Sequence, residues 1–174
     1  MVYNKENGNV IKAHTRRYLM PAKKQSEEVK QSEEIVEILS FLIGKQEFGI
    51  EVDYVELVNE RSEITPVPKS KAFIEGVMNL RGRIVPVVDL TKLMDIEYNA
   101  DDQFENVLIV KHEGSEIGFF VNEVKEVVRT TEEQVDRAAR TEQFDHKVKG
   151  IVQKGKRLIL YLDIDEVLKA CEGY

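Results

Sequence analysis

Two aspartates near the end of the chain are the side chains most able to bind a metal ion. Asp163 and Asp165 form a D-x-D pair, and paired carboxylates are typical ligands of divalent cations. A small metal-dependent enzyme that uses this pair is therefore one hypothesis. Asp163 also follows an apolar run and precedes a short helical pattern, as Asp89 does earlier in the chain. A carboxylate in that position accepts backbone N–H groups at the start of a helix, so we favour a structural role for Asp89 and Asp163.

The other reactive side chains form no catalytic pattern. His14, His112 and His146 lack the spacing of metal ligands, and Cys171 alone cannot complete a zinc site with them. The serines lack the context of a nucleophile elbow, and the isolated glycines form no phosphate-binding loop. We therefore expect no catalytic residue, no metal ion and no cofactor.

The stretch from Asn79 to Leu90 predicts a β-hairpin that ends at the start of a helix. Gly82 supplies the positive φ that a tight turn needs. The β-branched residues after Arg83 suit a buried strand. Pro86 has no N–H to give to a ladder, so we expect this strand to be an edge strand or to be bulged at that point.

Arg81, at the turn of this hairpin, leaves three interpretations open. Its side chain could be solvated, could pair with a carboxylate such as Glu56 or Asp89, or could bind an acidic partner through its planar guanidinium. Val55 and Leu57 are open in a similar way. Apolar residues in a short turn between strands pack in a core, or they line a groove that receives a partner helix.

Short β-rich runs separated by turns begin at Ile35 and continue to a final helix at residues 164–171. We expect strands at Ile35–Ile43, Glu47–Val52, Leu57–Arg61, Val77–Leu80, Ile84–Val88, Asn106–His112, Glu116–Val121, Glu126–Thr130, Val148–Val152 and Arg157–Leu162. Residues 1–34 are polar and lack an apolar period, which predicts a disordered N-terminal tail.

The strands form two copies of one pattern. Phe48–Val52 matches Ile117–Val121, Gly76–Met78 matches Gly150–Val152, Arg83–Val85 matches Arg157–Ile159, and Asp89–Leu90 matches Asp163–Ile164. The matching glycines Gly76 and Gly150 are interpreted as structural residues. A repeat of about 70 residues is too long for a solenoid unit, but five short strands can close into a small barrel. We therefore predict two five-stranded barrels in tandem, barrel one at about residues 35–95 and barrel two at about 105–163.

The composition argues against several classes of partner. The formal net charge is −7, and Lys and Arg form no one-sided cluster beyond the N-terminal tail, so nucleic-acid binding has little support. No run approaches the roughly 18 apolar residues of a membrane span, so we expect no direct membrane insertion. A single cysteine fits a reducing compartment. These features predict a cytoplasmic protein.

Three segments, in this order along the chain, resemble the CheW family of chemotaxis coupling proteins. They are Phe48–Val52 (FGIEV), Ile64–Pro68 (ITPVP) and Phe73–Leu90 (FIEGVMNLRGRIVPVVDL). The resemblance runs from about Ile35 to the C-terminus, so residues 35–174 are interpreted as a CheW-like domain. It implies a mainly β fold of two five-stranded SH3-like β-barrels with short helices and a shared core. It also implies an adaptor that is not an enzyme.

The same resemblance implies two protein partners. A CheW-like adaptor joins the regulatory domain of the histidine kinase CheA to the cytoplasmic hairpin tip of chemoreceptors, in arrays at the inner face of the membrane. The family motif falls on Asn79, Leu80, Arg81, Gly82, Pro86 and Asp89, and Val55 is the expected position in the groove between the barrels. Whether Arg81 contacts a partner or only shapes the groove stays open. The adaptor portion of a CheV-like protein is an alternative, although no receiver domain or kinase segment accompanies the barrels.

Overall fold

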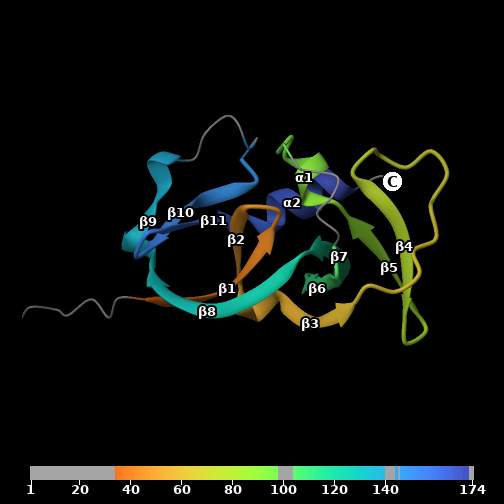
Figure 1. Ribbon diagram of the computed structural model, residues 1–174, viewed down its shortest axis with the longest axis horizontal. Coiled ribbons are helices and arrows are strands. Elements are labelled where there is room, and N and C mark those ends of the chain that lie inside the picture. The colour runs from red at the N-terminus through yellow and green to blue at the C-terminus, as the bar shows by residue number, and fades with distance from the viewer. Residues whose placement is uncertain (1–33, 98–103, 140–143, 145, 173–174) are drawn as a thin grey trace, which may run out of the picture. The chain divides into compact units, whose positions relative to one another are not determined.

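The computed structural model describes residues 34–97, 104–139, 144 and 146–172, all within the compact unit Ser32–Tyr174 (Figure 1). The predicted N-terminal tail lies outside the described residues, apart from Glu34. The described part is mainly β, as predicted, and contains two sheets and two short α-helices.

In chain order the elements are β1 (Ile35–Ile43), β2 (Gln46–Glu51), η1 (Val52–Tyr54), β3 (Val55–Glu60), β4 (Ile74–Leu80), β5 (Arg83–Val88), α1 (Leu90–Leu93), β6 (Asn106–His112), β7 (Ser115–Val121), β8 (Glu123–Thr131), η2 (Glu132–Gln134), β9 (Val135–Asp136), η3 (Arg137–Ala139), β10 (Val148–Lys154), β11 (Arg157–Leu162) and α2 (Ile164–Cys171). Each predicted strand has a counterpart, with shifts of a few residues at the ends. The final helix has the predicted bounds. Strand β9, in the polar connector, was not predicted.

The sheets take their strands from both halves of the chain. Sheet A has the order β8-β1-β2-β11-β10-β9, and sheet B has the order β3-β6-β7-β5-β4. The orders become identical, apart from β9, when β1, β2, β3, β4 and β5 are exchanged for β6, β7, β8, β10 and β11. The sequence repeat is therefore a structural repeat, in which each SH3-like barrel combines the first hairpin of one copy with the second hairpin of the other.

This exchange corrects the predicted boundaries. Barrel one does not correspond to residues 35–95, nor barrel two to 105–163, because β2 pairs in parallel with β11 and β5 pairs in parallel with β7. The physical reason is that a repeat shows which segments are alike but not which copy each hairpin pairs with. Exchange of the hairpins places apolar side chains from both copies in one common core.

Two glycines at matching positions leave room for apolar side chains inside the barrels. Gly49 on β2 lies opposite Tyr161, and Gly118 on β7 lies opposite Val87. A Cβ at Gly49 would stand 2.9 Å from Cγ2 of Ile159, and one at Gly118 would stand 2.7 Å from Cγ1 of a valine on β6. Both distances are shorter than an ordinary van der Waals contact, so the close packing inside each barrel requires glycine.

Three apolar clusters form the core of the described part. The largest contains residues of both sheets and of both α-helices, including Phe48, Phe119 and Val167, and is the predicted shared core. A second cluster lies in sheet B and includes Met78, Leu80, Val85, Val87, Val107, Ile109 and Phe120. A third lies in sheet A and includes Ile38, Val128, Val135, Val152, Ile159 and Tyr161. Each barrel thus has its own interior beside the common one.

Pro86 lies in β5, which is an inner strand of sheet B, but at this residue β5 has only β4 as a ladder partner, so the strand is locally an edge as expected. The ladder between β5 and β7 joins Val87–Val88 to Gly118–Phe119, and Pro86 precedes it. On the other side of β5, Val77 lies opposite Pro86 but exchanges both of its backbone hydrogen bonds with Thr65. Pro86 therefore occupies a position at which neither neighbouring strand needs its N–H.

Candidate partner-binding surface

The β4–β5 hairpin ends in a tight two-residue turn of the predicted kind. Leu80 pairs with Arg83, and between them Arg81 has φ 52° and Gly82 has φ 87°. Two successive positive φ values match the twist of the hairpin strands. Asn79 Oδ1 accepts a hydrogen bond of 2.8 Å from the N–H of Gly82 and stabilises the turn. The positive φ expected for Gly82 in the turn is confirmed.

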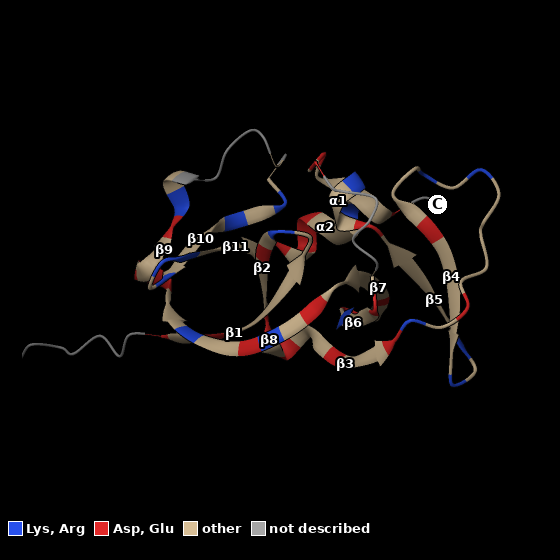
Figure 2. Cartoon of the chain, viewed as in Figure 1, with Lys and Arg blue, Asp and Glu red and all other residues tan. Residues whose placement is uncertain are grey.

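Arg81 projects from this turn into solvent. The side chain is exposed, and within the described part of the chain it has no hydrogen-bond or ion-pair partner. The interpretation that pairs Arg81 with Glu56 or Asp89 is therefore wrong. Basic residues mark the tip of the hairpin in Figure 2, and the free guanidinium keeps its full donor capacity for a partner.

Arg83, two residues further on, makes the ion pair with Glu56 that one interpretation offered for Arg81, and a second one with Glu116. Its Nη2 lies 2.8 Å from Oε1 of Glu56 on β3, and its Nη1 lies 2.5 Å from Oε1 of Glu116 on β7. The hydrogen bond from Arg83 lowers the pKa of Glu56. Burial, followed by the neighbouring Glu56 carboxylate, raises the pKa of Glu116. One guanidinium thus joins three strands of sheet B.

The predicted apolar contact residues are partly or fully buried. Val55, the first residue of β3, packs against the shared core. Leu57 packs against the sheet B cluster, in which Leu80 is 5% exposed. Pro86 is also buried. The structure therefore places Asn79, Arg81 and Gly82 on the surface and Leu80 and Pro86 beneath it, so a partner could touch the first three directly and the last two only through the backbone.

The aspartates cap helices, as favoured from the sequence. Asp89 Oδ1 accepts hydrogen bonds from the backbone N–H of Thr91 at 2.9 Å and of Lys92 at 3.4 Å, at the start of α1. Asp163 Oδ1 accepts one from the N–H of Glu166 at 3.4 Å, at the start of α2. Both arrangements satisfy N–H groups that a first helical turn leaves without an intrahelical acceptor.

The metal hypothesis does not fit this geometry. Asp165 pairs with His112 Nε2 at 2.8 Å, while Asp163 is engaged at the helix start. The two carboxylates therefore serve different partners. Among the described residues, no group of three or more His, Cys, Asp or Glu side chains could hold a metal ion.

Gly76 and Gly150 mark matching close approaches of backbone. Each lies at a register shift, in β4 and β10 respectively. A Cβ at Gly76 would stand 2.4 Å from the carbonyl oxygen of Thr65, and one at Gly150 would stand 2.7 Å from that of Asp136. Their position in the fold therefore supports the structural role expected for them.

A polar cluster that the sequence did not indicate lies at the end of β2. The Tyr161 hydroxyl donates a hydrogen bond of 2.6 Å to Oε1 of Glu51, and Lys149 Nζ donates one of 2.5 Å to the same atom. Burial raises the pKa of Glu51, but these two hydrogen bonds outweigh it and the pKa lies below its usual value. Burial, and then the bond to Glu51, raises the pKa of Tyr161. Glu51 is about a hundred positions away from Lys149 and Tyr161 along the chain, so no local pattern could have revealed the cluster.

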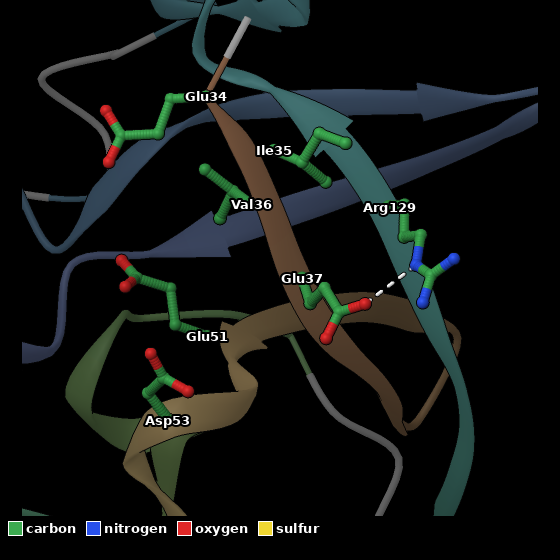
Figure 3. Close-up of a pocket in the computed structure, with 7 residues that line it drawn as sticks. All are labelled: Glu34, Ile35, Val36, Glu37, Glu51, Asp53 and Arg129. Carbon is green, nitrogen blue, oxygen red and sulfur yellow. Dashed lines mark hydrogen bonds and ion pairs between the residues drawn. The ribbon is translucent and has the colours of Figure 1, made fainter. Parts of the chain in front are cut away.

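A shallow acidic pocket opens beside β1 (Figure 3). Its volume is about 430 Å³, and it is lined by Glu34, Ile35, Val36, Glu37, Glu51, Asp53 and Arg129. Arg129 Nε pairs with Glu37 Oε1 at 2.7 Å, and Glu51 is held by the polar cluster above. None of the predicted partner-binding residues lines this pocket, so it is separate from the hairpin tip.

No helix among the described residues is both long and apolar enough to cross a membrane.

Comparison with protein families shows that the family model of the CheW-like domain matches residues 37–172. Among curated relatives, the chemotaxis protein CheW of Thermotoga maritima is 44% identical over 133 residues, which cover 76% of this chain and 87% of the relative. The Bacillus subtilis CheW is 31% identical over 144 residues, or 81% of this chain and 90% of the relative.

A solved structure has the same fold. The crystal structure of the scaffolding protein TtCheW from Thermoanaerobacter tengcongensis superposes with a TM-score of 0.68 at 27% identity and covers 78% of this chain and 88% of its own. The family match spans both barrels and includes the hairpin with Arg81 at its tip. The chain therefore belongs to the CheW family of chemotaxis proteins.

Proposed function

We propose that this protein is a non-catalytic adaptor that couples chemoreceptors to the histidine kinase CheA in cytoplasmic arrays at the inner face of the membrane. Membership of the CheW family supports the chemotaxis role. The observation that carries the binding role is the exposed Arg81, which has no partner among the described residues, at the tip of a hairpin whose base is buried.

The proposed binding surface combines the turn of the β4–β5 hairpin with the start of β3. Asn79, Arg81 and Gly82 offer exposed groups, and the half-buried Val55 and Leu57 lie on the same sheet. The ion pair between Arg83 and Glu56 brings these two regions within side-chain reach of each other. The guanidinium of Arg81 beside apolar side chains suits a receptor helix that has an acidic face and an apolar face.

The first experiment changes the charge at the tip. Arg81→Asp should weaken binding to a receptor hairpin fragment or to the CheA regulatory domain by about tenfold or more, since a desolvated charge contact is reversed. Binding is measured by calorimetric titration, and thermal melting checks the fold. Lys156→Asp, at the tip of the matching β10–β11 hairpin, is the control and should leave both affinities near the wild-type values. Normal affinity of Arg81→Asp for both partners would contradict the role assigned to Arg81.

The second experiment separates the two partners. Val55→Glu should weaken receptor binding more than kinase binding, because it places a charge in the expected groove. Val124→Glu, at the matching position of β8, tests whether the loss of receptor binding is specific to the β3 position in sheet B. Equal loss of both partners, or a collapsed fold, would remove Val55 from the receptor surface.

A further inference from the structure

The outer half of the β4–β5 hairpin extends beyond the backbone ladder that holds its base. On β5 only Val87 and Val88 pair with β7, so the segment from Arg83 to Pro86 has β4 as its sole ladder partner among the described strands. Ile84 is 65% exposed, and a Cβ at Gly82 would meet no atom within 4 Å. Backbone pairing with β7 therefore does not fix the position of this segment.

Side-chain ion pairs take the place of the missing ladder. Arg83 connects β5 to β7 through Glu116 and to the far edge strand β3 through Glu56. In the strand order of sheet B, β3 and β5 are separated by β6 and β7, so the contact to Glu56 spans the mouth of the barrel. The guanidinium fork can hold two carboxylates at once, which a single ammonium group cannot do with the same geometry.

The matching hairpin of sheet A depends less on its arginine. Arg157 pairs with Glu126 on β8 at 2.5 Å and with Glu47 on β2 at 3.4 Å. Each hairpin thus has an arginine that is held by two carboxylates, an arrangement called a clamp below. The β11–β2 ladder is longer, however, because it includes Leu160, the counterpart of Pro86, opposite Phe48. Backbone hydrogen bonds thus hold the second hairpin closer to its tip than they hold the first.

We propose that Arg83, gripped by Glu56 and Glu116, is a positioning residue that fixes the β4–β5 turn so that Arg81 is presented in one orientation to an acidic protein partner. The inference rests on the proposed adaptor function for the identity of that partner. Arg83 itself is engaged with carboxylates of its own chain and acts through Arg81. The clamp therefore sets the affinity for the partner, whereas Arg81 makes the contact.

Hydrogen exchange and binding of the full chain test this role. In Arg83→Met, amide exchange at residues 80–84 should accelerate about tenfold, as expected where a local restraint is lost, and the affinity for the receptor hairpin fragment should fall about fivefold. Arg157→Met, the matched control, should leave exchange at residues 80–84 and the affinity within about twofold of wild type. The melting temperatures of the two variants should be similar, because both lose one partly exposed clamp.

Milder variants keep the test decisive if a methionine variant folds poorly. Arg83→Lys retains the charge but not the fork, and Glu116→Gln removes one carboxylate. Each should give exchange rates and affinities between those of wild type and Arg83→Met. Wild-type exchange at residues 80–84 in Arg83→Met, or an equal loss of affinity in Arg157→Met, would overturn the positioning role.

The outcome is separable from the test of the adaptor function. If the wild-type chain binds neither CheA nor the receptor fragment, the proposed function fails, and faster exchange at residues 80–84 still supports the clamp. If the wild type binds and Arg81→Asp weakens binding while Arg83→Met changes neither exchange nor affinity, the positioning role alone fails.

Discussion

The two barrels have the same backbone plan and different interiors. In both, a glycine lies opposite the same position of a parallel partner strand, Gly49 in sheet A and Gly118 in sheet B. Phe120 of sheet B is replaced at the matching position by Glu51 in sheet A. The Phe120 ring stacks on Phe104 at 5.2 Å, whereas Glu51 is held by hydrogen bonds. At this position one barrel therefore has apolar packing and the other has a polar cluster.

A second pair of positions shows the same contrast. Ile109 of sheet B lies opposite Gly118, and its counterpart Ser40 lies opposite Gly49 in sheet A. Both are fully buried, and the Ser40 hydroxyl has no hydrogen-bond partner within the described residues. A buried hydroxyl without a partner costs about 1–3 kcal/mol. At this pair of positions the residue in sheet B is therefore the more favourable of the two.

The β4–β5 and β10–β11 hairpins also differ in apolar packing, which is again greater in sheet B. Leu80 anchors the β4–β5 turn in the sheet B cluster, and its counterpart Lys154 is exposed. A turn anchored by a buried leucine can present a free charge such as Arg81 in a defined place. The two hairpin tips thus differ in their apolar packing, and the contrast between the barrels can be tested at paired positions.

The largest losses of stability are expected at the matching glycines of β4 and β10. Gly76→Ala should destabilise the protein by about 3 kcal/mol and Gly150→Ala by about 2 kcal/mol. Both methyl groups meet backbone carbonyl oxygens, but Gly76 alone has a positive φ, of 150°. Urea unfolding of the two variants measures the effect. A larger loss of stability in Gly150→Ala than in Gly76→Ala would contradict the cost assigned to the positive φ of Gly76.

The helix caps should show smaller losses of stability than the glycines. Asp89→Ala should cost about 2 kcal/mol and Asp163→Ala about 1 kcal/mol, since a lost cap typically costs 0.5–2 kcal/mol. Asp89 is 5% exposed and also accepts a hydrogen bond of 2.5 Å from the Thr91 hydroxyl. Asp89→Asn and Asp163→Asn retain an acceptor and should restore most of each loss. Equal costs in the two alanine variants would mean that burial of Asp89 adds nothing to its cap.

The smallest effect is the pH dependence that comes from Glu51 of sheet A. Because the pKa of Glu51 is lowered from 4.5, the folded state binds this proton less readily than the unfolded state does. Glu51 therefore contributes stability that is fully present above about pH 4.5 and is lost as the pH falls through its lowered pKa. Glu51→Gln should melt at a lower temperature than wild type at pH 7, with the gap shrinking below pH 4.5.

Glu113→Gln, at the exposed β6–β7 turn, is the control for this titration. Its melting temperature should stay close to that of wild type over the same pH range. A gap between wild type and Glu51→Gln that stays constant down to pH 3 would contradict a role for the Glu51 charge.

Much of the local structure could be predicted because its causes are local. The β-branched runs gave the strands, Gly82 gave the turn, and Asp89 and Asp163 gave the caps. One of the three interpretations of Arg81 placed an ion pair with Glu56 on the wrong arginine, for a geometric reason. Arg81 is in the turn with a left-handed backbone, whereas Arg83 begins the strand and can reach Glu56 and Glu116. Side-chain direction depends on backbone geometry that composition does not show.

The amino-acid sequence by itself determined the family, the strands, the repeat and the residues at the hairpin tip, because these depend on residue types and on short-range spacing. Only the tertiary structure decided that the copies exchange hairpins, that Pro86 belongs to an inner strand, and that Glu51, Lys149 and Tyr161 meet. Strand pairing and polar contacts between distant segments are chosen by how all the apolar faces pack together, and no single segment carries that information.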